Sequence, residues 1–132
     1  MTRLAGAGWL VVALALAGVS GCSDNGPVAG VLQVSLTTPN SGADGAILLS
    51  VTGPQALTSV APEAGGALRA FAQPLSTTTK IAVTGPLASG AMITIGVADV
   101  RQSAQYTARI QAVAASDFQL RSLAGYSLTV SR

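Results

Sequence analysis

The sequence predicts an all-β fold, an antiparallel β-sandwich of about seven to eight strands, in the part of the chain after residue 30. Apolar and polar residues alternate with a period of two in a series of short runs, which gives each run one face for a core and one for water. Breakers containing glycine or proline separate the runs at intervals typical of hairpins in sandwiches. The alternating runs lie at 32–37, 47–52, 81–83, 93–97, 106–112 and 126–131.

The chain begins with a short charged segment followed by a long uncharged one. Arg3 is the only charged residue among residues 1–19, and residues 9–17 (WLVVALALA) are continuously apolar. This run is too short for a permanent membrane-spanning helix, which needs about 20 apolar residues. Its length matches the central region of a secretory signal, whereas the alternative of a short membrane anchor requires a longer run. We therefore predict a cleaved helical signal peptide over residues 1–21.

The residues that follow the apolar run resemble the lipobox of bacterial lipoproteins. Val19-Ser20-Gly21-Cys22 has the aliphatic residue, the two small residues and the cysteine of that motif. The resemblance implies cleavage before Cys22, a lipid on the Cys22 thiol, and anchoring to a membrane of the bacterial cell envelope. Ser23 resembles the residue found in lipoproteins of the outer membrane, although Asp24 comes one position later. The alternative is an ordinary secreted protein whose only cysteine lies near the cleavage site.

A polar segment with glycine and proline joins the cysteine to the first alternating run. Residues 22–30 lack apolar periodicity, so we predict the lipidated cysteine and a flexible tether there, and one domain over 31–132. A chain of about 110 residues can bury a sufficient core without disulfides. Two segments are ambiguous, because 67–73 (ALRAFAQ) and 114–124 each allow a short helix.

The second half of the chain resembles immunoglobulin-like β-sandwich domains. Residues 99–112 (DVRQSAQYTARIQA) look like a strand of fibronectin type III domains, and residues 90–97 (GAMITIGV) resemble a strand of cohesin-like modules. The first resemblance implies that Tyr106 forms a tyrosine corner, with a buried ring and a hydroxyl bonded to nearby backbone. The expected fold class is therefore an immunoglobulin-like sandwich, and no functional residue is carried over.

The composition removes most catalytic chemistries. The chain has no histidine, and its single cysteine is assigned to lipidation. Catalysis of the Ser-His-Asp or Cys-His kind and most zinc or transition-metal sites therefore lack their residues. Asp44, Glu63, Asp99 and Asp117 all lie in turn-like contexts, where Asp usually bonds to backbone, and Lys80 is expected to be exposed. We predict a non-enzymatic protein with no catalytic residue and no cofactor.

Charged residues are few and scattered. They make up 9% of the chain, and without Arg3 six basic and five acidic side chains remain. Nucleic acid binding needs clustered cations, so we expect no nucleic acid partner. Calcium binding by Asn40 and Asp44 remains an open alternative, but calcium prefers six to eight oxygens, and Asp44-Gly45 is also typical of a hairpin turn. We predict no metal site.

Phe71 and Phe118 are the only rings outside the leader that the alternation does not assign to the core, and they are the candidate ligand contacts. The sequence therefore favours a lipid-anchored sandwich with a structural or protein-interaction role in the cell envelope. A protein-interaction role predicts an exposed apolar patch or a free sheet edge. Its expected partners are the membrane, through Cys22, and an envelope protein or polysaccharide. The alternative function is a carbohydrate-binding module at the cell surface, with Phe71 or Phe118 in a shallow groove.

Overall fold

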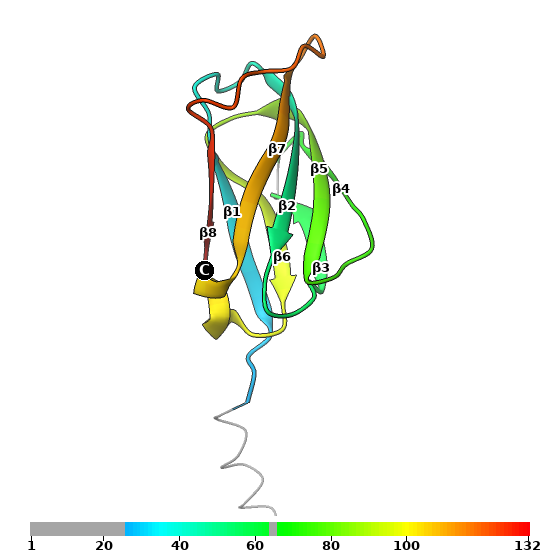
Figure 1. The fold of residues 1–132 in the computed structure, drawn as a ribbon, viewed down its shortest axis with the longest axis vertical. Helices are drawn as coiled ribbons and strands as arrows, with labels where there is room; N and C mark the ends of the chain where they lie inside the picture. Colours follow the sequence, from blue (N-terminus) through cyan, green and yellow to red (C-terminus); the bar gives the residue numbers. More distant parts are fainter. Residues whose placement is uncertain (1–25, 64–65) are drawn as a thin grey trace, which may run out of the picture.

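The computed structural model describes residues 26–63 and 66–132. Two antiparallel four-stranded sheets pack face to face (Figure 1), so the expected all-β sandwich is confirmed. No helix in the described part is long and apolar enough to span a membrane. The expected signal peptide and Cys22 lie outside the described residues. The elements are β1 (Gly30–Thr37), β2 (Asp44–Thr52), β3 (Ser59–Pro62), β4 (Arg69–Ala72), β5 (Thr78–Leu87), β6 (Gly90–Val97), the 3-10 helix η2 (Val100–Gln105), β7 (Thr107–Ala115) and β8 (Ser127–Ser131).

The strand pairs are nested along the chain. One sheet has the order β3-β6-β1-β8 and the other β4-β5-β2-β7. Thus β4 pairs with β5, β3 with β6, β2 with β7 and β1 with β8, as if one long hairpin were folded across two sheets. The strands run along the long axis of the molecule (Figure 1). The chain enters the sandwich at one end, and the connections 38–43 and 116–126 lie at the opposite end.

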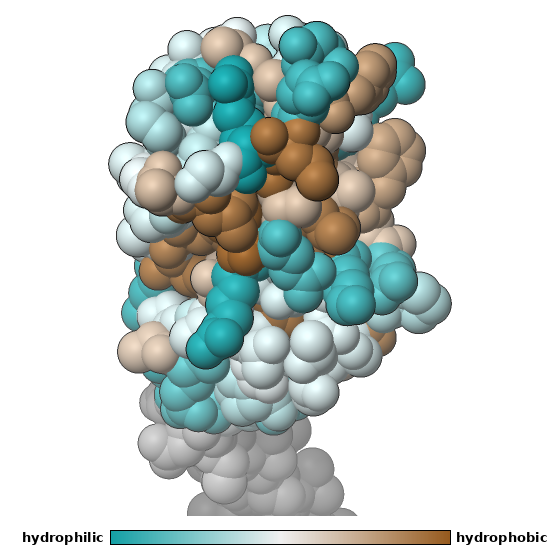
Figure 2. Space-filling model, turned by 45° about the horizontal axis from the view of Figure 1, so that its top comes forward, coloured by the Kyte–Doolittle hydropathy of each residue, from teal (hydrophilic) through white to brown (hydrophobic). Residues whose placement is uncertain are grey.

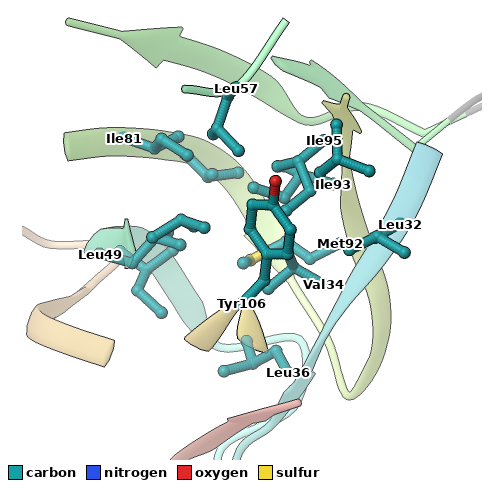
Figure 3. Close-up of a cluster of buried hydrophobic side chains, with 14 of the residues drawn as sticks. Leu32, Val34, Leu36, Leu49, Leu57, Ile81, Met92, Ile93, Ile95 and Tyr106 are labelled. Carbon is teal, nitrogen blue, oxygen red and sulfur yellow. The ribbon is translucent and has the colours of Figure 1, made fainter. Parts of the chain in front are cut away.

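The core lies between the sheets and comes from the apolar positions of the alternating runs (Figure 3). Full burial of a Leu, Ile or Val side chain contributes about 1.5–3 kcal/mol to folding. Among the described residues, the buried apolar side chains of the core fall between positions 32 and 113. Those from the alternating runs are Leu32, Val34, Leu36, Ile47, Leu49, Val51, Ile81, Val83, Ile93, Ile95 and Val97.

Tyr106 lies in this core, with its hydroxyl directed toward Leu57 (Figure 3). Its ring is 3% exposed, as expected. The ring packs directly on Gly53, where any Cβ would overlap it. The hydroxyl has no hydrogen-bond partner among the described residues, so the expected tyrosine-corner bond is absent. A buried hydroxyl without a partner costs about 1–3 kcal/mol of stability.

The structure settles the two ambiguous segments, 67–73 and 114–124, and differs from the expectation for residues 100–105. Within 67–73 the chain forms the edge strand β4, and within 114–124 it finishes β7 and then forms a loop without a helix. Residues 100–105, placed in a strand by the resemblance, form η2 instead. The Asp99 side chain caps η2 by accepting a hydrogen bond from the Arg101 backbone N–H at 3.1 Å, which satisfies a donor that a helix start leaves free.

A bulge in β7 reverses part of the expected alternation. The register with β2 shifts so that Leu48 pairs with Ala112 and Leu49 pairs with Ile110, which leaves Gln111 as an extra residue. A one-residue shift moves the following side chains to the other face of the sheet. Val113 is therefore buried and Ala112 lies beside Leu48 on the outer face. The alternation over 106–112 predicts that Ala112 faces inward with Tyr106 and Ile110, and this prediction is wrong.

The end of the predicted tether is fixed to the sandwich. The Val28 N–H donates to Asp99 Oδ1 at 3.3 Å, and the Val28 carbonyl accepts from the Val100 N–H at 2.8 Å. The Arg101 guanidinium donates to the Gly26 carbonyl and pairs with Asp99 at 3.2 Å. The hydrogen bond from the Arg101 side chain is the main cause of a lowered pKa of the Asp99 carboxyl. Residues 26–29 thus belong structurally to the folded domain.

Candidate functional site

The outer face of the sheet β4-β5-β2-β7 carries a row of apolar side chains. In the registers of adjacent strands, Phe71 of β4 pairs with Ala82 of β5, and Ala82 pairs with Leu48 of β2. Leu48 in turn pairs with Ala112 of β7. These four residues are called the apolar row below. Phe71 is 58% exposed and Leu48 is 39% exposed. The solvent face of an antiparallel sheet usually carries polar residues, so this row needs an explanation other than folding.

The loop after β7 extends the apolar row toward the end of the sandwich far from the tether. Leu120 forms an isolated bridge with Ala114, and Leu120 and Phe118 are 78% and 87% exposed. Figure 2 shows apolar surface in the middle of this region with hydrophilic residues around it. A shallow depression of about 140 Å³ lies between the row and the loop. It is lined by Ala46, Ile47, Leu48, Ala82, Ala112, Val113, Ala114 and Leu120.

Phe118 stands beside a second depression, of about 390 Å³. It is the only non-glycine residue with a positive φ, 69°, in the described part of the chain. That conformation costs a residue with a Cβ about 1–2 kcal/mol and is found at functional sites. A Cβ on Gly45 would lie 2.9 Å from the Ser116 backbone, so glycine is needed there. The lining residues are Gly42, Asp44, Gly45, Gly85, Pro86, Ala115, Ser116 and Phe118.

Three cationic side chains flank the apolar row. On one side, Lys80, Ser50 and Arg109 lie in register across β5, β2 and β7. On the other side, Arg69 of β4 pairs with Thr84 of β5. All three cations are exposed. The row therefore has two cations along one long side and a single cation, Arg69, at the β4 end of the other side.

These three cations have no acidic partner among the described residues. The two ion pairs in the described ranges use other arginines, with Arg101 bound to Asp99 and Arg121 bound to Asp44. Apart from the buried Asp44 at the end of β2, the strands β4, β5, β2 and β7 contain no carboxylate. The outer face therefore combines an apolar centre with uncompensated positive charge.

Asp44 is buried at the end of this sheet and has a structural role. Its Oδ2 accepts from Thr38 Oγ1 at 2.7 Å, its Oδ1 accepts from Arg121 Nε at 2.9 Å, and the Tyr126 hydroxyl lies 3.0 Å from both oxygens. The Asn40 side-chain amide donates to the Tyr126 hydroxyl at 2.9 Å. The network joins loop 38–43 to loop 116–126 and occupies the carboxylate oxygens that the calcium alternative required. In the described ranges, no three His, Cys, Asp or Glu residues gather where they could hold a metal.

The two candidate contact residues are both exposed but lie at different places. Phe71 is on the edge strand β4 within the apolar row, whereas Phe118 is on the loop, and the depression beside Phe118 does not include Phe71. The alternation over 47–52 places Leu48 on the water face, as observed, but sequence reasoning did not single out Leu48 or Leu120 as contact residues. For Leu48 a signal existed, because Ile47-Leu48-Leu49 places an apolar residue at a position that should face water. Cys22 lies outside the described residues.

Comparisons with protein-family models, with curated proteins and with solved structures found no match.

Proposed function

We propose that this chain is a lipid-anchored, non-enzymatic module of the bacterial cell envelope that binds another envelope protein through the outer face of the sheet β4-β5-β2-β7. The observation that carries the proposal is the exposed apolar row and its continuation into Leu120 and Phe118. Large contiguous apolar patches are uncommon on monomers and mark interaction sites. A partner that covered this surface would gain about 25 cal/mol for each Å² of apolar area removed from water.

The lipobox-like residues 19–22 support the location. A lipid on Cys22 would hold the domain at a membrane surface, and Ser23 favours the outer membrane. Because residues 26–29 dock against η2, only residues 22–25 separate the lipid from the sandwich. Four residues reach at most about 14 Å. The module would thus act close to the membrane surface.

Carbohydrate binding is the second candidate function. The exposure of both Phe71 and Phe118 favours it, because sugar rings stack on exposed aromatic side chains. The other large exposed members of the face, Leu48 and Leu120, are aliphatic, which fits a protein partner better.

Site-specific photocrosslinking tests the proposal in cells that produce the acylated protein. A photoreactive amino acid replaces Leu48 or Ala82 in the apolar row, and the control replaces Gln33 on the outer face of the other sheet. We expect a discrete protein adduct from positions 48 and 82 and none from position 33. Adducts with polysaccharide alone would support the carbohydrate alternative. Equal labelling from all three positions, or no adduct, would contradict both candidates.

A further inference from the structure

We infer that the partner element bound by the apolar row is an acidic amphipathic helix, with glutamate or aspartate on both sides of an apolar stripe. This inference rests on the proposed function and names the chemistry of the partner. The juxtaposition that carries it is the apolar row with Lys80 and Arg109 along one side and Arg69 along the other.

The charges on this face select the partner. Three exposed cations flank the row, two on one side and Arg69 on the other, and none has a carboxylate partner among the described residues. A second copy of the chain would bring the same three cations against one another, and facing like charges oppose association. An element with acidic flanks would instead supply the missing counter-charges. Such pairing favours the correct partner and speeds its association.

The direction of the row favours a helix over an extended strand. The row crosses the sheet at right angles to the strands, from Phe71 on β4 to Ala112 on β7. A strand that added to the sheet would have to run along an edge, not across the face. Four strands at a spacing of about 4.8 Å make the row about 14 Å long. A helix covers that length with about ten residues, which bring apolar side chains at i, i+4 and i+7 onto one face.

The surface relief also suits helix side chains. The small residues Ala82 and Ala112 alternate along the row with the large residues Phe71 and Leu48. The shallow depression beside Leu120 could accept one branched side chain of the partner. The cations then lie on both flanks of a helix placed along the row, close to its e- and g-like positions.

A lipid surface fits the same chemistry less well. The described chain leaves the sandwich at the end of the strands, through residues 26–29 bound to Asp99 and Arg101. The sheet face therefore lies parallel to the direction of exit (Figure 1), and the chain does not leave the sandwich through this face. An anionic vesicle provides the experimental check on this point.

The test uses mature chain 22–132 with Cys22→Ser, which carries no lipid and retains every buried core residue of the described ranges. The probes are two synthetic helical peptides with the same leucine stripe, one with glutamates on both flanks and one with lysines. Isothermal titration calorimetry compares their affinities. We expect the glutamate peptide to bind at least about tenfold more tightly than the lysine peptide. We also expect its affinity to fall about tenfold or more from 50 to 500 mM NaCl, because salt screens exposed charges.

Charge-reversal variants locate the binding. Lys80→Glu with Arg109→Glu should weaken the glutamate peptide by about tenfold or more and should strengthen the lysine peptide. Arg132→Glu, at the exposed C-terminus, is the matched control and should change either affinity by less than about twofold. Circular dichroism confirms that each variant is folded.

Equal affinities for the two peptides, or no effect of the double reversal, would overturn the inference. Binding to vesicles with 30% phosphatidylglycerol that is lost in the same double variant would also overturn it, and would assign the face to lipid. These outcomes are distinct from a failure of the proposed function. Protein adducts at positions 48 and 82 would still stand if the partner proved not to be acidic.

Discussion

Leu48 lies at the centre of the apolar row, and its exposure follows from strand alternation alone. Its neighbours Ile47 and Leu49 are both buried in the core, so a strand geometry with period two requires Leu48 to point outward. The exposed part of the Leu48 side chain adds nothing to the burial of the core. A single residue that departs from the alternating pattern therefore indicates the surface on which the proposed function depends.

Tyr106 provides a second test at the scale of one residue. Its hydroxyl is buried without a partner, so Tyr106→Phe should leave the free energy of unfolding unchanged or raise it by about 1 kcal/mol. Tyr126→Phe is the matched control, because the Tyr126 hydroxyl bonds to Asp44 and Asn40, and its loss should cost about 1–3 kcal/mol. Urea unfolding measures both. A loss above about 1 kcal/mol for Tyr106→Phe would mean that its hydroxyl has a bonding partner.

Asp99 makes the docking of residues 26–29 dependent on pH. Its pKa in the folded protein is lowered, chiefly by the side-chain hydrogen bond from Arg101, so its stabilising contribution is complete above the unfolded pKa of about 3.9. The contribution is lost as the pH falls through the lower folded value. We expect the NMR signal of the Val28 amide to shift with a midpoint below the unfolded pKa of Asp99, and Asp99→Asn to abolish that transition. A midpoint at or above the unfolded value would contradict the assigned hydrogen bonds.

At the scale of elements, the strands with regular alternation were predictable and the irregular ones were not. The runs at 32–37, 47–52 and 93–97 became β1, β2 and β6 because their buried faces match the sandwich core. The four-residue strand β3 ends at Pro62 and is too short to show a period, as is usual for an edge strand. The Gln111 bulge depends on pairing with β2, so the outward position of Ala112 could not be read from β7 alone.

The loop 116–126 owes its position to Asp44. Arg121 and Tyr126, both in this loop region, bond to the buried carboxylate, and their contacts hold the segment that presents Phe118 and Leu120. Asp44→Asn should destabilise the domain by about 2–3 kcal/mol, because the Arg121 guanidinium loses its ion-pair partner. The cost stays below that of breaking a fully buried pair because the Arg121 side chain is partly exposed to solvent. Limited proteolysis should then cut within 116–126 first.

The control for this loop is Asp117→Asn. Asp117 is exposed and accepts only a local hydrogen bond from the Gln119 N–H, at 3.1 Å, so its replacement should cost less than about 1 kcal/mol. Equal destabilisation by the two substitutions would show that the buried network does not position the loop.

At the scale of the whole molecule, the proposed lipid anchor precedes the end of the sandwich where residues 26–29 dock, and the proposed contact face lies along its side. The fold class was predictable because strand alternation is a local pattern, and the same alternation left Phe71 and Phe118 outside the core, where both are exposed. Their contact with a ligand stays a prediction. The apolar row and its cationic borders depend on which strands become neighbours, and the nested strand order was not readable from the alternation.

The anchor has its own test, independent of the contact face. Mass spectrometry of the protein purified from a bacterial host should find an N-terminus at Cys22 with a diacylglyceryl thioether and an acylated amino group. Globomycin, which blocks the lipoprotein signal peptidase, should leave residues 1–21 attached. A free Cys22 thiol in the native product would remove the membrane location from the account.

The most direct measurement of the contact face is thiol accessibility in intact envelopes. The chain has a single cysteine, Cys22, so introduced thiols report without interference once that residue carries lipid. Leu48→Cys and Ala82→Cys should react slowly with a polar maleimide in native envelopes and quickly after purification, whereas Gln33→Cys should react at the same rate in both. Equal rates at positions 48 and 82 in the two settings would contradict the claim that a partner covers the apolar row.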